Sequence, residues 1–320
     1  MTQTHSHPPA PSQDRILAGV ALMLMFCVLA PLLDVSSKLA AATIPVGQIT
    51  AARFVVQGGL MIPVALFMGV SWYLTPRMVG LVTLRAFLLL ISTYGFVAAV
   101  SVMPIADALA IVFVEPFILL MLGKWLFGDE VGPRRLAASV VGFCGVLLVI
   151  QPSLAIYGLV TLFPLGSAFA FAFYMLVTRA MSATVHPVAM QLHTSIAGVA
   201  LCLPVMLLAD GTGWATLDPV MPQGLDWLWL FGVGFWAGLS HMCMTYALKF
   251  APASTLAPLH YFEIIVAVAL GYLVFSDFPN ALTWVGIAII VAAGLYVIHR
   301  ERLTAKSHHA ADAIAEAPLV

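Results

Sequence analysis

Charged residues are scarce in this sequence. Asp, Glu, Lys and Arg make up only 8% of its 320 residues, while hydrophobic residues make up 62%. Soluble domains carry roughly a quarter charged residues, so this composition excludes an ordinary globular protein. A helix needs roughly 20 apolar residues to cross a bilayer, and uncharged runs of about that length recur along the chain. We therefore predict an integral membrane protein that lies in a lipid bilayer.

Motifs for several kinds of site are also missing. The four cysteines stand singly in apolar segments, and no Cys/His spacing links them, which argues against disulfides and metal sites. There is no Gly-x4-Gly-Lys-Ser/Thr motif for a nucleotide, and neither Gly-x-Ser-x-Gly nor His-Glu-x-x-His for hydrolysis. A net charge of −1 offers no footprint for nucleic acid. We expect no enzyme, no cofactor and no nucleic-acid partner.

The apolar runs predict ten transmembrane helices, which gives an all-α membrane fold. A polar, Pro-rich tail (1–15) precedes them and a second tail (299–320) follows. The first apolar run lacks a small-residue cleavage site, so it is expected to span the membrane rather than act as a signal peptide. The predicted spans are residues 16–37, 46–70, 78–99, 105–127, 134–151, 156–178, 188–209, 226–249, 254–275 and 281–298.

Most basic residues of the connections and tails lie on one side of the predicted membrane. If the N-terminus lies inside, the outside connections hold only Lys38, and the long loop 210–226 is purely acidic. By the positive-inside rule, both termini are then cytoplasmic in a bacterial-type inner membrane. The inside residues are Arg15, Arg77, Arg134, Arg135, Arg179, Lys249, Arg300, Arg302 and Lys306.

The two halves of the chain resemble each other. MPIADALAIVFVEPF (103–117) aligns without a gap on APASTLAPLHYFEII (251–265), which places Glu115 on Glu263. Each half has five predicted helices, and an odd number of crossings inverts the second half relative to the first. Inverted repeats of this kind build alternating-access transporters, whose substrate site lies near the midplane. The predicted five-helix units are residues 16–151 and 156–298.

The five-plus-five layout and three stretches, MPIADALAIVFVEP, APASTLAPLHYFE and IPVGQITAAR, resemble the EamA-type branch of the drug/metabolite transporter superfamily. The resemblance runs from about Leu17 to Ile298. It implies an inverted-repeat bundle around a central cavity and transport of small organic solutes. Many family members carry Trp-Gly in the first helix, where this chain has VLAPLLDVSSK (28–38). That variant is similar to the subgroup of S-adenosylmethionine and riboflavin carriers, which take up cofactors and their precursors.

Glu263 is the only charged residue between Ala253 and Phe275. It lies about ten residues into its span and hence near the midplane, where an ionised side chain costs at least roughly 2.5–3.5 kcal/mol. Glu115 is expected at the same depth, in a span that enters the membrane from the opposite side. Both are candidates to line a cavity and to bind a substrate group or a coupled proton. The alternative is a protonated Glu that holds neighbouring helices together.

Other polar and aromatic residues are candidates for the same cavity. His260 lies one turn from Glu263 and could modulate that carboxylate, or be a neutral His hydrogen-bonded within the bundle. His241 shares a helix face with Gly238 and Thr245 and is a further cavity candidate. Aromatic side chains that could stack on a flat ligand, or simply pack the bundle, are Tyr94, Phe96, Tyr174, Trp236, Tyr246, Tyr261 and Phe262.

Asp34, Lys38 and Arg53 are predicted to form an ion-pair network near the outer side. Asp34 and Lys38 are spaced i, i+4 and can neutralise each other, with Arg53 as a third partner. Alternatively, Arg53 anchors an anionic substrate. Arg85 and Lys124 are expected to extend their charges towards the cytoplasmic surface.

The sequence as a whole predicts a secondary transporter of a small organic metabolite. Uptake of riboflavin or a similar planar cofactor precursor is the first hypothesis. Export or exchange of amino acids or related metabolites is the second. Both proton coupling through Glu263 or Glu115 and facilitated exchange are compatible with these residues. The sequence predicts neither a monomer nor an oligomer.

Overall fold

The computed structural model describes residues 13–70, 73–127, 133–182, 184–250, 256, 259, 261–296 and 299. These residues are helical with short connections and contain no strand, so the all-α prediction is confirmed. The helices are α1 (Gln13–Ala40), α2 (Val46–Phe67), α3 (Pro76–Val100), α4 (Ile105–Val112), α5 (Glu115–Phe127), α6 (Pro133–Tyr157), the 3-10 helix η1 (Gly158–Leu162), α7 (Phe163–Ser182), α8 (Pro187–Ala209), α9 (Asp226–Phe250), α11 (Phe262–Phe275) and the helix Ala281–Tyr296.

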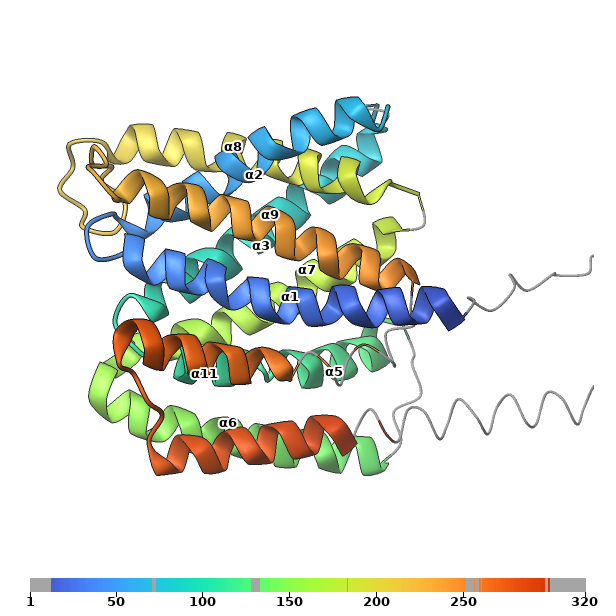
Figure 1. Ribbon diagram of the computed structural model, residues 1–320, viewed down its shortest axis with the longest axis vertical. Helices are drawn as coiled ribbons and strands as arrows, with labels where there is room; N and C mark the ends of the chain where they lie inside the picture. Colours follow the sequence, from blue (N-terminus) through green and yellow to red (C-terminus); the bar gives the residue numbers. More distant parts are fainter. Residues whose placement is uncertain are drawn as a thin grey trace, which may run out of the picture.

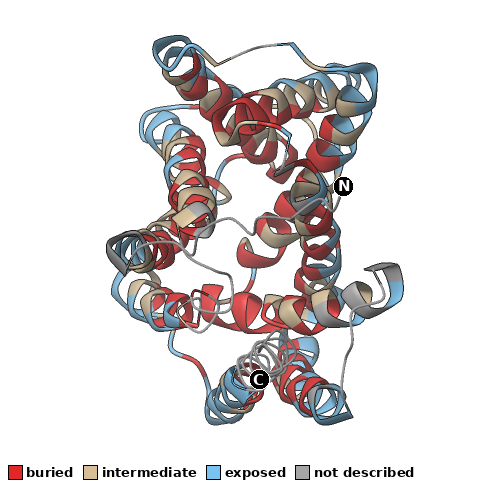
Figure 2. Ribbon diagram, turned by 90° about the vertical axis from the view of Figure 1, so that its right-hand side faces the viewer, coloured by how far each residue is buried: buried red, intermediate tan, exposed pale blue. Residues whose placement is uncertain are grey.

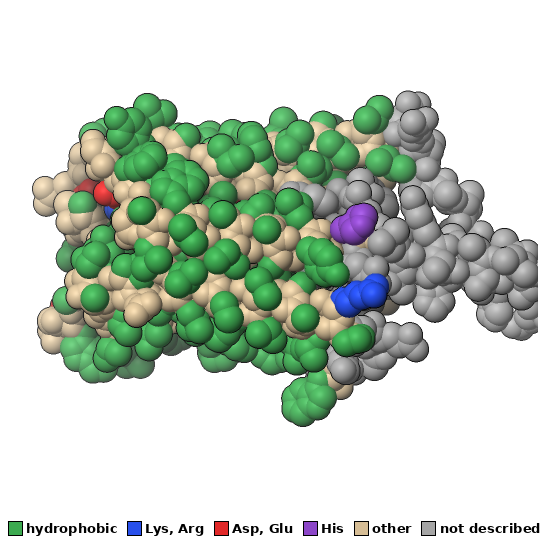
Figure 3. All heavy atoms as spheres, turned by 90° about the horizontal axis from the view of Figure 1, so that it is seen from below, with side chains coloured by type: hydrophobic (Ala, Val, Ile, Leu, Met, Phe, Trp, Pro, Cys, Tyr) green, Lys and Arg blue, Asp and Glu red, His purple; other side chains and the backbone are tan. Residues whose placement is uncertain are grey.

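The described helices have the length and hydrophobicity of membrane spans. Six helical stretches are long and apolar enough to cross a bilayer, and two shorter apolar helices, Phe262–Phe275 and Ala281–Tyr296, accompany them. Large apolar side chains cover the side of the bundle seen in Figure 3, while charged side chains appear only towards its two ends. Such a surface is stable in hydrocarbon and not in water, which confirms an integral membrane protein. The six stretches are Ile16–Ala40, Val46–Phe67, Pro76–Val100, Leu136–Thr178, Pro187–Ala209 and Asp226–Ala247.

The helices lie roughly parallel in one bundle, and their pairings are reciprocal between the two halves (Figure 1). α1 packs on α9 as α7 packs on α3, and α2 packs on α9 as α8 packs on α3. In the same way α1 contacts α11 while α7 contacts α5. Seen along the helices, buried residues face the interior and exposed ones the periphery (Figure 2). The polar residues described below therefore lie inside this ring.

The predicted fourth span, residues 105–127, is wrong as a single helix. The structure breaks it at Phe113 and Val114 into α4 and α5. Pro116 explains the break, because it has no N–H for the carbonyl of Val112 and its ring collides with that carbonyl. Glu115 therefore opens a new helix instead of sitting in the middle of one. In the second half α11 begins at Phe262, so Glu263 also stands in a first helical turn.

The predicted gap between the fifth and sixth spans is also wrong. α6 continues through Pro152 to Tyr157, and η1 then leads directly into α7. Gly158 ends α6 with φ +68°, a left-handed conformation that glycine adopts without a steric penalty. The turn thus lies several residues later than the predicted gap between residues 151 and 156.

Two glycines allow α6 and the helix Ala281–Tyr296 to touch. A Cβ added to Gly286 would lie 2.8 Å from the carbonyl oxygen of Gly145, and one added to Gly145 would lie 3.0 Å from that of Gly286. Small residues at such a crossing permit close backbone contact, which drives helix association in membranes.

We expect Gly286→Val to separate these two helices. Overpacking of a tight contact typically costs about 1–3 kcal/mol, so the melting midpoint of the detergent-solubilised protein should fall. Gly166→Val is the matched control, since a Cβ on Gly166 meets nothing within 4 Å. Equal midpoints for the two variants would contradict the close crossing.

Candidate functional site

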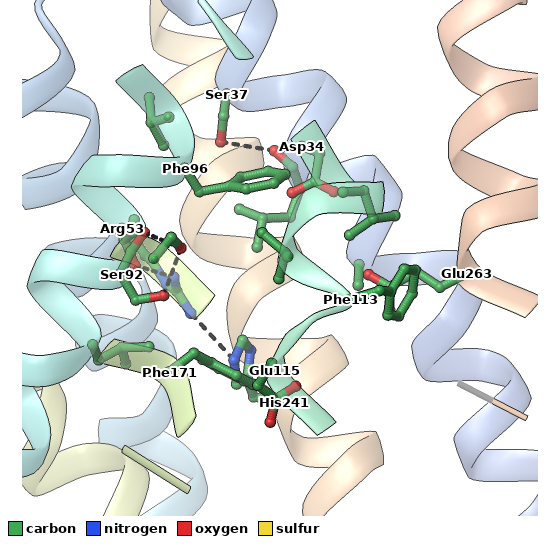
Figure 4. Close-up of a pocket in the computed structure, with 18 of the residues that line it drawn as sticks. Asp34, Ser37, Arg53, Ser92, Phe96, Phe113, Glu115, Phe171, His241 and Glu263 are labelled. Carbon is green, nitrogen blue, oxygen red and sulfur yellow. Dashed lines mark hydrogen bonds between the residues drawn. The ribbon is translucent and has the colours of Figure 1, made fainter. Parts of the chain in front are cut away.

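A cavity lies at the centre of the bundle, between helices of both halves. α1, α2, α3, α4 and α5 contribute side chains from the first half, and α7, α9 and α11 from the second. Figure 4 shows these side chains converging from opposite sides. The lining residues are Phe26, Ala30, Leu33, Asp34, Ser37, Arg53, Leu89, Ser92, Thr93, Phe96, Val97, Leu109, Val112, Phe113, Glu115, Ser167, Phe171, His241 and Glu263.

Arg53 is the positive group of the cavity wall. Its side chain is 5% exposed, and its Nη1 donates to the hydroxyl of Thr93. Its Nη2 lies 3.3 Å from Nε2 of His241 (Figure 4). Nδ1 of His241 faces the carbonyl of Ala237 at 2.9 Å, and a carbonyl can only accept, so Nδ1 carries the hydrogen. Nε2 then accepts from Arg53, and His241 is neutral in this arrangement.

One nitrogen of Arg53, the buried Nε, has no hydrogen-bond partner among the described residues. A buried unpaired N–H costs roughly 1–3 kcal/mol, which a bound acceptor group can recover. Arg53 can therefore orient an acceptor in the cavity while Thr93 and His241 hold its other nitrogens.

Three buried carboxylates face this arginine across the cavity. Asp34, Glu115 and Glu263 are each at most 8% exposed and line the same space. Glu115 and Glu263 stand in the first turns of α5 and α11. The partial positive charge of a helix N-terminus stabilises an acidic side chain there. These first-turn positions thus lower the cost of placing charge inside the bundle.

Phenylalanine rings separate these polar groups. Phe26, Phe96, Phe113 and Phe171 line the cavity from four different segments. Ser92 and Ser167 lie between them, with hydroxyl oxygens 3.0 Å apart, and join α3 to α7. The arrangement can hold the face of a flat ring against phenylalanine and its polar edge against hydroxyl, guanidinium and carboxylate groups.

The structure brings together some of the predicted site residues and not others. Glu263, Glu115 and His241 line the cavity with Asp34 and Arg53. Tyr94 packs in an apolar cluster between α1, α2, α3 and α9. The rings of Trp236 and Tyr246 lie beside Phe235 and Phe250, with centroids 4.9 and 6.1 Å apart. These three aromatics are not among the lining residues. His260 lies outside the described residues.

The predicted pairing of Asp34 with Lys38 is wrong. Lys38 Nζ lies 2.6 Å from Oδ2 of Asp277 and 3.0 Å from the carbonyl oxygen of Met103. Asp34 is turned into the cavity instead, where the charges of Arg53 and Glu263 act on it. The i, i+4 spacing permitted the pair, but α1 presents the two residues to different neighbours.

Arg85 does not extend towards the membrane surface as predicted. It is 2% exposed, with Nη2 2.5 Å from the hydroxyl of Tyr174 and Nε 2.8 Å from that of Thr178. Its Nη1 also donates to the hydroxyl of Thr194. The guanidinium carbon lies 4.5 Å from the Tyr174 ring centre. Arg85 therefore joins α3, α7 and α8 in the interior.

Sequence reasoning missed the hydroxyl and phenylalanine lining. The signal available was the stretch ISTYGF (91–96), where two hydroxyl residues stand inside an apolar span. Hydroxyls in membrane helices commonly bond back to their own backbone, so they mark a site only weakly. The five residues missed are Ser92, Thr93, Phe113, Ser167 and Phe171, whereas Phe96 was predicted and does line the cavity.

Comparison with known proteins identifies the same family along nearly the whole chain. The model of the EamA-like transporter family matches residues 17–151 and again 158–299. A riboflavin transporter of Vibrio cholerae is 28% identical over 298 residues, 92% of this chain and 95% of its own length. An S-adenosylmethionine uptake transporter of Rickettsia prowazekii is 23% identical over 293 residues, 92% and 96% of the two chains. The pseudopaline exporter CntI of Pseudomonas aeruginosa is 24% identical over 285 residues, 88% and 95%.

Proposed function

Because this chain belongs to the EamA-like transporter family, and is thus a membrane transporter of small metabolites, we propose that it takes up a planar cofactor precursor, riboflavin first. The central cavity carries the proposal. It offers four phenylalanine rings for a flat ring system, and hydroxyl, guanidinium and carboxylate groups for its polar edges. The name of the Vibrio cholerae relative supports the same substrate.

Alternating access through an inverted repeat is the proposed mechanism. Two five-helix units, 16–151 and 156–298, would rock about the cavity between them. The reciprocal pairings of the two halves and the two family matches support this division. Glu115 and Glu263 would then be equivalent groups of the two units, each in the first turn of a half-helix beside the site.

We further propose that the N- and C-termini lie in the cytoplasm of a bacterial-type inner membrane. α1 begins, and the helix Ala281–Tyr296 ends, at the same end of the bundle (Figure 1). The scarcity of basic residues in the connections of the other end supports this orientation. Lys38 and the acidic loop 210–226 would then face outwards.

Growth rescue tests uptake and substrate together. A riboflavin-auxotrophic bacterium without its own carrier should grow on low external riboflavin when it expresses this protein. It should not grow with the empty vector. Absence of rescue, with the protein confirmed in the membrane, would overturn riboflavin uptake and leave the family assignment standing.

Export of an amino acid or related metabolite is the second candidate. One arginine facing three carboxylates complements a molecule that carries both charge signs. The similar protein of Pseudomonas aeruginosa is a pseudopaline exporter, so exporters occur among proteins like this one. Amino-acid release from loaded cells, raised by expression of this protein, would favour this candidate over riboflavin uptake.

A further inference from the structure

A second polar cluster lies away from the central cavity, at the end of the bundle where α1 ends and α4 begins. None of its members is among the cavity-lining residues. Its residues come from five parts of the chain that packing brings together: α1, α4, α6, the segment after α11, and the helix Ala281–Tyr296. We call it the outer cluster. It comprises Lys38, Asp107, Ser153, Asp277 and Thr283.

Asp107 is the buried centre of this cluster. It is 4% exposed, and the side chains of Ser153 and Thr283 interact with its carboxylate. Yet Oδ1 of Asp107 and the hydroxyl oxygens of Ser153 and Thr283 form no hydrogen bond of ordinary geometry within the described residues. Buried polar atoms are almost always paired. The two hydroxyls can donate to the Asp107 carboxylate when it is ionised and accept from it when it is protonated, so the cluster can hold Asp107 in either state.

The charges around Asp107 are unequal. Lys38 forms its ion pair with Asp277, donates to the carbonyl of Met103 and lies 4.7 Å from the centre of the Phe275 ring. One ammonium therefore faces two carboxylates, since both Lys38 and Asp277 act electrostatically on Asp107. Tyr157 of α6 is a further titratable neighbour among the described residues, and it is neutral at ordinary pH. Ionised Asp107 would leave one negative charge uncompensated.

We propose that Asp107 of the outer cluster binds the proton that drives transport. A proton neutralises the uncompensated carboxylate, and the hydroxyls of Ser153 and Thr283 can accept the hydrogen bond that protonated Asp107 donates. The inference deepens the proposed uptake function and rests on it for the direction of transport.

The position of Asp107 links it to the substrate cavity. It lies in the first turn of α4, and Glu115 opens α5 just beyond the other end of that short helix. Lys38 lies one turn from Asp34 on α1. When Asp107 is ionised it competes with Asp277 for Lys38, and when it is protonated Lys38 remains with Asp277 and Met103. Protonation of Asp107 thus favours the contacts of Lys38 that the structure shows, with Asp277 and with the carbonyl of Met103.

Infrared spectroscopy tests the proton without any substrate. Difference spectra of the protein in vesicles, between pH 8 and pH 5, should show the carbonyl band of a protonated carboxylic acid. Asp107→Asn should lose that band, while Asp210→Asn, at the exposed end of α8, should keep it. A band unchanged in Asp107→Asn would overturn the assignment of the proton to Asp107.

Vesicle transport tests the coupling. With the membrane potential clamped, a one-unit pH gradient (acid outside) can drive about tenfold accumulation of a neutral solute that enters with one proton. The wild type should approach that ratio for riboflavin, and Asp107→Asn should only equilibrate it. Accumulation by Asp107→Asn equal to that of the wild type, or accumulation that follows a sodium gradient instead, would overturn coupling at Asp107.

The two experiments separate the proposals. If the wild type moves no riboflavin but the infrared band is present in the wild type and absent in Asp107→Asn, riboflavin uptake fails and the proton site stands. If riboflavin enters down its gradient and the band survives substitution, the uptake proposal stands and the proton site fails.

Discussion

Replacing Glu263 by Gln should reduce riboflavin uptake by about 10–100-fold, because a hydrogen bond to a charged group contributes about 1.5–3 kcal/mol. Gln keeps the size and shape of the side chain, so the variant should still reach the membrane at the normal level. Glu263 is 5% exposed and faces the cavity with Arg53 and Asp34. The measurement is the initial rate of riboflavin entry per molecule of protein in vesicles.

Two comparisons make this result specific. Asp210→Asn removes an exposed carboxylate outside the cavity and should transport like the wild type. Glu115→Gln changes the equivalent residue of the other half and should also lose activity if both units bind substrate. Wild-type rates in Glu263→Gln would assign this carboxylate to packing alone.

Glu263 also shows how far sequence can lead to a site. Its isolation in an apolar run predicted that it matters, since an intramembrane charge is costly. Its actual surroundings depend on where its helix begins, at Phe262, which the apolar pattern does not reveal. In the first half the helix break follows from Pro116, which the sequence displays and which a continuous span should not have tolerated.

Partners across the bundle could not be predicted from spacing. Lys38 had an acidic residue one turn away at Asp34, and local spacing favoured that pair. Its true partner, Asp277, is 239 residues distant and is reached only because α1 packs on α11. Periodicity gives the face of a helix, but the neighbouring helix on that face is a property of the assembled bundle.

Arg85 illustrates the same limit with a larger energetic consequence. Long basic side chains near helix ends usually extend to the membrane surface, which is what its position suggested. Instead, hydroxyls on α7 and α8 accept from its guanidinium in the interior. The hydroxyls of Thr178 and Thr194 also donate to the carbonyls four residues earlier, so their oxygens are held in place to receive it.

Replacing Arg85 by Ala should destabilise the bundle by about 3–5 kcal/mol, as loss of a buried paired charge or of a large buried side chain does. The change leaves the Tyr174 hydroxyl without its donor and opens a cavity among three helices. The melting midpoint in detergent and the amount of protein in the membrane should both fall. Arg85→Met keeps most of the volume and should lie between Ala and the wild type.

The exposed Arg77 of α3 is the matched control, since Arg77→Ala removes the same side chain from the surface and should leave the midpoint unchanged. Burying a guanidinium has its own desolvation cost, which its removal relieves. A melting midpoint that falls from the wild type to Arg85→Met and again to Arg85→Ala therefore means that the hydrogen bonds and packing of Arg85 outweigh that cost. A midpoint of Arg85→Met above the wild type would reverse the conclusion. Arg85 would then be retained at the expense of stability, which points to a part in the movement of α3, α7 and α8 during transport.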